Sequence, residues 1–124
     1  MIVVNGLSKK TIFVSITSIE RQMRKLHIPF PPLSNYACGN WKLCGRVGKA
    51  RQCEWLAAVR SGRIVGVWEI DRNFGWHPMQ RSMIPGVQQQ NDPDRWFCRL
   101  IPINNQSALI NQRARLYFPF DFNF

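Results

Sequence analysis

Acidic side chains and histidines are scarce in this sequence of 124 residues, which has seven Asp or Glu and two His residues. Hydrolytic mechanisms need a positioned base, and the only candidates are His27, His77 and the close pair Glu69 and Asp71. Glu69 and Asp71 share a face if one strand carries both, although ion pairs with nearby arginines are a more ordinary role for them. The segment GRVGKA lacks the spacing and the following Ser or Thr of a phosphate-binding glycine loop. No catalytic residue is therefore assigned, and binding is favoured over catalysis.

Short Cys-x-x-Cys spacings are also lacking. The four cysteines are separated by six, nine and 45 positions: Cys38, Cys44, Cys53 and Cys98. Structural zinc sites usually use two closely spaced pairs of ligands, so this pattern argues against one. We expect free thiols, partly in the core, with no metal and no cofactor.

Long apolar runs are absent as well, since none approaches the roughly 18–20 residues that a membrane-spanning helix needs. The first residues, MIVVNG, lack the basic region and apolar core of a secretion signal. We therefore expect a cytoplasmic protein with no membrane partner. The 45% hydrophobic and 12% aromatic content favours a single folded domain over residues 1–124.

What the sequence does have is positive charge, with a formal net charge of +10. Residues 1–53 hold nine Lys or Arg against Glu20 alone, whereas residues 54–98 hold five basic and five acidic side chains. Arginines outnumber lysines twelve to five, which suits forked contacts to phosphate and stacking on bases. This charge distribution predicts a polyanionic partner, and nucleic acid is the commonest one.

A two-stranded hairpin is predicted around Ser61-Gly62, a dipeptide typical of a tight two-residue turn. The turn predicts four opposed pairs: Arg60 with Arg63, Val59 with Ile64, Ala57 with Gly66, and Trp55 with Trp68. Both faces of the hairpin are largely apolar, so it should lie inside a sheet or small barrel. The paired tryptophans beside the Ala57–Gly66 gap suggest the frame of a cleft.

The remaining elements follow from apolar patterns and from the positions of proline and glycine. Strands are expected at 2–4, 11–17 and 95–103, and a terminal strand at 116–124 that Pro119 places at an edge or bulge. A helix capped by Ser18 should run to Leu26, with a shorter one at 47–53. Three prolines make 29–36 irregular, and 73–94 should be a long connection with at most one short strand.

Tryptophans next to basic or polar residues are the best candidates for binding bases. Stacking of one base on such a ring contributes roughly 1–3 kcal/mol. Packing in the core explains Trp41 and Trp76 about as well, and it explains Trp55 and Trp68 better. The candidate nucleic-acid-binding residues are Trp41, Lys42, Arg46, Lys49, Arg51, Arg72, Trp76, Arg95, Trp96, Arg113 and Arg115.

A series of short motifs resembles a small bacterial and phage family. In order along the chain they are GNWK, GKAR, WLAAVRSGRIVGVWEID, WHP, DRWF and NQRARLYF, from about Gly39 to Phe118. We place that family near the PUA-like folds, which include the EVE, ASCH and YTH domains. The sequence departs from the family pattern at Cys38, where arginine is usual, and at Arg113-Ala114, where Asn-Pro is usual.

The resemblance implies an α+β protein built as a small, partly open β-barrel with short helices at its rim. It also implies binding of RNA or DNA, with a modified or flipped base held in a pocket at the barrel mouth. The residues carried over are Trp41, Lys42, Trp76, Arg95, Trp96 and Arg115. The two departures fall near this pocket, so the identity of the ligand stays open.

Three functions remain as hypotheses. The first is a nucleic-acid-binding module, associated with phage or bacterial defence. The second is a small hydrolase acting on a nucleoside or nucleic acid, for which Lys42, Glu69, Asp71 and His77 are the available groups. The third is a basic inhibitor or interaction module, which either uses its positive surface against an acidic partner or adds its aromatic C-terminal strand to the sheet of a protein partner.

Overall fold

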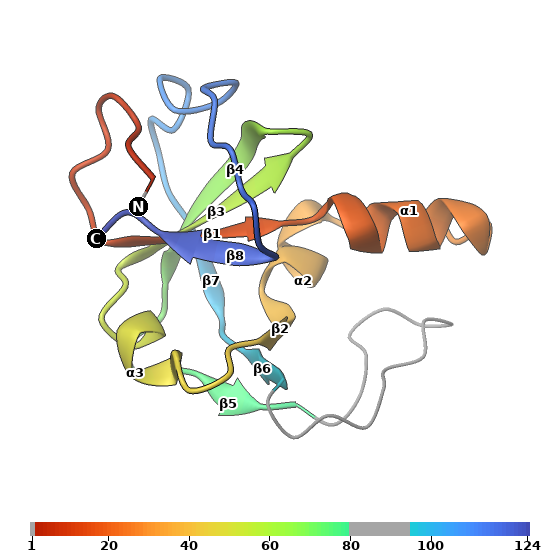
Figure 1. The fold of residues 1–124 in the computed structure, drawn as a ribbon, viewed down its shortest axis with the longest axis horizontal. Coiled ribbons are helices and arrows are strands. Elements are labelled where there is room, and N and C mark those ends of the chain that lie inside the picture. Colours follow the sequence, from red (N-terminus) through yellow and green to blue (C-terminus); the bar gives the residue numbers. More distant parts are fainter. Residues whose placement is uncertain (1, 80–94) are drawn as a thin grey trace.

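The computed structural model describes residues 2–79 and 95–124 and has an α+β architecture of two sheets and three short helices (Figure 1). The larger, mixed sheet has the strand order β7-β4-β3-β1-β8. Its strands are β1 (Thr11–Ser15), β3 (Trp55–Arg60), β4 (Arg63–Ile70), β7 (Leu100–Pro102) and β8 (Phe120–Phe122). Both strand orders are open-ended in the described part of the chain, so no closed barrel forms there.

The smaller, antiparallel sheet has the order β2-β6-β5. Its strands are β2 (Gly39–Lys42), β5 (His77–Pro78) and β6 (Arg95–Phe97), and the helices are α1 (Thr17–Lys25), α2 (Leu33–Ala37) and α3 (Val47–Ala50). Among the described residues, no helix has the length and apolar character needed to cross a bilayer.

Two hydrophobic clusters cover the larger sheet. Alternate residues of β1 enter different clusters: Ile12 and Val14 belong to one, and Phe13 belongs to the other. All three side chains are fully buried, as expected for a central strand that is covered on both faces. The predicted position of the hairpin is confirmed, because β3 and β4 are both interior strands.

The hairpin turn is confirmed, but half of the predicted register is wrong. Ser61 and Gly62 have φ angles of 50° and 77°, as in a type I′ turn, and the pairs Arg60–Arg63 and Val59–Ile64 form. Beyond them Val65 is an extra residue in a β-bulge, so Ala58 rather than Ala57 lies opposite Gly66. The bulge shifts every later residue of β4 to the other face.

The register shift also removes the predicted cleft between paired tryptophans. Trp68 lies opposite Leu56, and Trp55 lies opposite Glu69. A Cβ atom on Gly66 would overlap Cη2 of Trp68 and lie 3.1 Å from Cδ2 of Leu33, so the indole fills the space above this glycine. Trp55 and Trp68 pack against different hydrophobic clusters, in agreement with the core role favoured for both.

Three predictions for the first forty residues need correction. Residues 2–4 form no strand, although Ile2 is buried and donates its N–H to the Phe122 carbonyl. Helix α1 begins at Thr17 and has no side-chain cap, so Ser18 lies within it. The region 29–36 is not wholly irregular, because α2 begins directly after Pro32, where a helix has no need of the preceding N–H.

Two later segments are shorter than predicted. The strand expected at 95–103 divides into β6 and β7, which belong to different sheets because the chain changes sheet at Cys98-Arg99. The terminal strand is limited to β8, at the sheet edge where Pro119 placed it. The helix expected at 47–53 forms over Val47–Ala50, and β5 is the short strand found in the described part of 73–94, whose residues 80–94 lie outside the described range.

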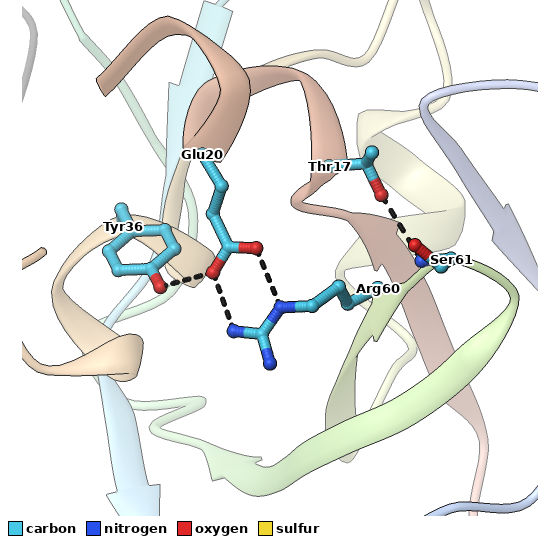
Figure 2. A network of polar contacts seen from close by, with 5 residues as sticks. All are labelled: Thr17, Glu20, Tyr36, Arg60 and Ser61. Atoms are coloured by element: carbon cyan, nitrogen blue, oxygen red, sulfur yellow. Dashed lines mark hydrogen bonds and ion pairs between the residues drawn. The ribbon is translucent and has the colours of Figure 1, made fainter. Parts of the chain in front are cut away.

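A buried carboxylate connects α1, α2 and the hairpin (Figure 2). Glu20 is fully buried and accepts hydrogen bonds from Nε and Nη2 of Arg60 and from the Tyr36 hydroxyl, each 2.6 Å long. Ser61 at the turn adds a bond from its N–H to Thr17 Oγ1, 3.3 Å long. These contacts attach the tip of the hairpin to the first turns of α1.

The charges of this network determine its pKa values. Burial raises the pKa of Glu20, but the hydrogen bonds and positive charge of Arg60 outweigh burial, and the net pKa lies below the usual 4.5. Burial and the neighbouring carboxylate raise the pKa of Tyr36 to about 12, so the phenol stays protonated as a donor. Glu20 is therefore ionised in the folded protein at neutral pH.

We expect Arg60→Met to reverse the pH dependence that Glu20 contributes to stability. In the wild type the lowered pKa gives stability that is present above about pH 4.5 and is lost as the pH falls through the folded-state pKa. Without Arg60, burial dominates and raises that pKa, so stability should fall as the pH rises through it. At neutral pH the loss should be about 3–5 kcal/mol.

Urea unfolding between about pH 4 and pH 7 measures this slope. Arg21→Met removes the same charge from an exposed position of α1 and serves as the control. A wild-type pH slope in Arg60→Met would contradict the assignment.

The second prediction concerns Gly66. Gly66→Ala should destabilise the fold by about 1–3 kcal/mol, because the added methyl group would overlap the Trp68 indole and displace it. Gly48→Ala in α3 is the matched control, since its Cβ would have no neighbour within 4 Å. Thermal unfolding of both variants tests this, and equal melting temperatures would contradict it.

Candidate functional site

A hollow of about 650 Å³ opens where β4 ends. One wall follows α3 and contains Arg51 and Cys53, and the other is the segment that leaves β4 after Ile70. Its lining includes cationic, amide and aromatic groups together with small and aliphatic residues. The lining residues are Arg51, Cys53, Ile70, Arg72, Asn73, Phe74, Gly75 and Trp76. Arg51, Arg72 and Trp76 are predicted site residues, and the structure brings these three together.

The segment after β4 is shaped by Asp71. Its Oδ1 accepts the N–H groups of Asn73 and Phe74 at 3.1 and 3.2 Å, and its carbonyl accepts the N–H of Gly75 at 2.9 Å. Gly75 has a φ of 76°, a left-handed conformation that suits glycine. The condition under which Glu69 and Asp71 would share a strand face is not met, because β4 ends at Ile70 and Asp71 forms this turn.

Two arginines stack on aromatic rings beside the hollow. The guanidinium carbon of Arg51 lies 5.9 Å from the ring centroid of Trp96, and that of Arg99 lies 4.4 Å from the centroid of Phe74. Both arginines are exposed. A guanidinium over an aromatic ring gains cation–π attraction, and its N–H groups can still donate to an anion.

His77 belongs to the same aromatic group. Its ring centroid lies 4.6 Å from that of Phe74 and 5.9 Å from that of Phe97. Its Nε2 lies 2.6 Å from the Phe74 carbonyl oxygen, which can only accept, so this nitrogen carries the proton. Nε2 thus supports the turn as a donor to the backbone.

Trp41 and Trp76 are core residues. They are 8% and 4% exposed, and each indole N–H donates to a carbonyl at the end of a helix: Trp41 to Ala37 at 2.8 Å, and Trp76 to Ala50 at 3.2 Å. A ring buried to this extent has no free face on which a base can stack. Trp76 still forms part of the wall of the hollow. Trp96 is only partly buried and lies opposite Trp41 in the smaller sheet.

The other predicted residues lie at three places outside the hollow. Lys42 and Arg95 are opposed across β2 and β6, where Nη1 of Arg95 donates to the Asn40 carbonyl at 2.9 Å. Arg46 and Lys49 lie over the ring of Phe122, 5.2 and 5.0 Å from its centroid. Arg113 and Arg115 lie with Arg63 near the hairpin turn, at the opposite end of β4 from the hollow.

Several groups at the site are not among the predicted residues. Asn73, Phe74 and Arg99 had no assigned role, although Asp71 and Gly75, four residues apart, are a signal for a tight turn that exposes the residues between them. Lys10 lies 5.1 Å from the centroid of Phe124 and extends the basic surface around α3. No local pattern indicates this contact, because it joins the two ends of the chain.

Cys53 lines the hollow, but its thiol is not a reactive nucleophile. Burial raises the pKa of Cys53 to about 12 and that of Cys38 to about 11, and it raises the pKa of Cys98 still further. All four cysteines are free thiols, and Cys44 is the exposed one. Across residues 2–79 and 95–124, no group of three His, Cys, Asp or Glu side chains is placed to hold a metal ion.

Comparisons with known proteins return no match to a family model, to a curated protein or to a solved structure. The case for a function therefore rests on the geometry and charge of the chain itself.

We expect one cysteine to react rapidly with a maleimide in the folded protein at neutral pH. Thiolates are the nucleophiles, and the other three thiols are buried with raised pKa values. Mass spectrometry should show one adduct at early times and four after unfolding. Cys44→Ser should abolish the early adduct, whereas rapid labelling of Cys53 would show that the floor of the hollow is open to solvent.

Proposed function

We propose that this chain is a nucleic-acid-binding module that holds one unpaired nucleotide at the hollow beside β4. The observation that carries the proposal is the pair of stacked arginines, Arg51 on Trp96 and Arg99 on Phe74, at the sides of a hollow that also contains Arg72. The proposed fold is a PUA-like, partly open barrel with its ligand at the mouth.

The charge at the hollow supports phosphate as the anchoring group. Arg51, Arg72 and Arg99 are exposed around it, and the carboxylate of Asp71, in the adjoining turn, already accepts two N–H groups of that turn. A phosphate held by arginine forks would gain charge-assisted hydrogen bonds without having to displace an internal carboxylate. The overall charge of +10 adds long-range attraction to a polyanion.

The size and lining of the hollow support a base as the second group. Its volume of about 650 Å³ is within the range of small-molecule pockets. Phe74 and Trp76 give it apolar surface, and Asn73 contributes an exposed amide that can donate and accept. A base turned out of its stack, including one that carries a modification, meets both requirements.

The hydrolase alternative gains no comparable support. Asp71 Oδ1 and His77 Nε2 are both bonded to backbone groups of the same turn. They shape the segment that lines the hollow.

The test is binding of single-stranded and duplex DNA and of RNA, with and without base modifications, measured by fluorescence anisotropy over a salt series. For a single strand, the slope of log affinity against log salt should fall by about 0.7 for each phosphate that Arg51→Gln or Arg72→Gln no longer neutralises. Arg21→Gln, on the exposed face of α1, removes the same charge and should leave the slope unchanged. Absence of binding to every nucleic acid at low salt would refute the proposal.

A further inference from the structure

Three arginines gather at the end of β4 that lies away from the hollow. Arg63 and Arg113 are directly opposed in an antiparallel bridge, and Arg115 follows two residues later. All three are exposed. Within the described ranges, the hairpin ion pair is made by Arg60 to Glu20, and neither Arg63 nor Arg113 contacts a carboxylate.

The backbone bonds show how closely two of these arginines are paired. The Ile64 N–H donates to the Gln112 carbonyl, and the Ala114 N–H donates to the Gly62 carbonyl, both at 2.9 Å. This pattern makes Arg63 and Arg113 a non-hydrogen-bonded pair, the arrangement in which opposed side chains come closest, with Cα atoms about 4.5 Å apart. Like charges opposed in this way destabilise a sheet. The fold thus keeps a repulsive pair that an anion would neutralise.

The same surface repeats the chemistry of the hollow. The guanidinium carbon of Arg115 lies 5.6 Å from the ring centroid of Tyr117, and Tyr117 is 78% exposed. An arginine thus lies beside an aromatic ring that is largely exposed to solvent. Such a surface can bind a phosphate and accept the face of a base.

The two arginine surfaces are well separated. Arg63 and Ile70 are seven residues apart along β4. At about 3.3 Å per residue, the distance between them along the strand is roughly 23 Å. Figure 1 shows the β3–β4 turn and the segment leading to β8 at the top of the view, with α3 and β5 at the bottom. At 3.4 Å per nucleotide of a stacked strand, this separation corresponds to roughly seven nucleotides.

We propose that Arg63, Arg113, Arg115 and Tyr117 form a second nucleic-acid-binding surface, which holds the phosphate backbone of the strand whose unpaired nucleotide occupies the hollow. This inference rests on the proposed function for its ligand. It adds a minimum length for the bound nucleic-acid strand, because only a strand of more than roughly seven nucleotides reaches both surfaces. Of the predicted site residues, Arg113 and Arg115 then belong to this second surface.

The test uses two oligonucleotides of about four and about sixteen nucleotides, which span the usual range of single-strand site sizes. Arg63→Gln combined with Arg113→Gln should bind the short strand like the wild type. For the long strand, its salt slope should be lower than that of the wild type by about 1.4, at about 0.7 for each phosphate no longer neutralised. Arg21→Gln combined with Lys25→Gln removes two charges from the exposed face of α1 and should match the wild type with both strands.

The remaining outcomes separate the two proposals. An unchanged salt slope in the Arg63/Arg113 variant, or an equal decrease in the α1 control, overturns the proposal of a second surface. Neither result affects the proposal that a nucleotide binds at the hollow. Failure of the wild type to bind the short strand, with long-strand binding still dependent on Arg63 and Arg113, overturns the hollow and supports the second surface. Binding of polyglutamate that depends on these arginines, without binding of either oligonucleotide, overturns both in favour of an acidic protein partner.

The conservative pair Arg63→Lys and Arg113→Lys checks for a structural effect. Arg63 Nη1 also donates to the Asn111 carbonyl at 2.9 Å, so its removal can loosen the segment before β8. Lysine keeps the charge but lacks the fork. Recovery of most of the salt slope by the lysine pair supports direct binding of phosphate, whereas a slope as low as that of the glutamine pair assigns the decrease to the Asn111 bond and overturns the proposal.

Discussion

The ion pair between Glu20 and Arg60 is the constraint on which the arrangement of the larger sheet and its helices depends. A carboxylate with no solvent exposure needs a compensating partner, and Arg60 is in reach only if the hairpin tip lies against α1. The Tyr36 hydroxyl adds the same requirement for α2. One charge thereby fixes two helices on the strands. It also neutralises Arg60, whereas Arg63, opposite it across the turn, contacts no carboxylate among residues 2–79 and 95–124.

The sheet separates the positive charge into surfaces with different surroundings. Around α3, Arg46 and Lys49 lie over the ring of Phe122, whereas Arg51 lies over the ring of Trp96 and lines the hollow. At the far end of β4, Arg63 and Arg113 are opposed. Aromatic rings accompany the arginines at both ends, and this pairing distinguishes these surfaces from a uniformly basic protein. Such a uniform field would attract a polyanion without positioning it.

Local patterns predicted the features that local chemistry determines. Ser61-Gly62 predicted the turn, β-branched residues predicted β1, and Pro119 predicted the position of β8 at the sheet edge. The bulge at Val65 was missed because the Val-Gly sequence around it also suits a regular strand, and one extra residue exchanges the faces of β4. The buried state of Glu20 was missed for another reason: its partners are 16 and 40 positions away along the chain. Residues of the hollow come from two separate segments, so only some of them could be found from adjacent motifs.

The bond from the Trp76 indole to the Ala50 carbonyl joins the two walls of the hollow. Ala50 ends α3, whose last carbonyls have no partner within the helix, and a side chain of the opposite wall supplies one. The position of Arg51, the next residue, is thereby set relative to the turn that carries Arg72. The conformational entropy of bringing these walls together is lost when the chain folds, before any ligand arrives. A ligand that bound at the hollow would therefore meet preorganised walls, and its affinity would not be reduced by the cost of assembling them.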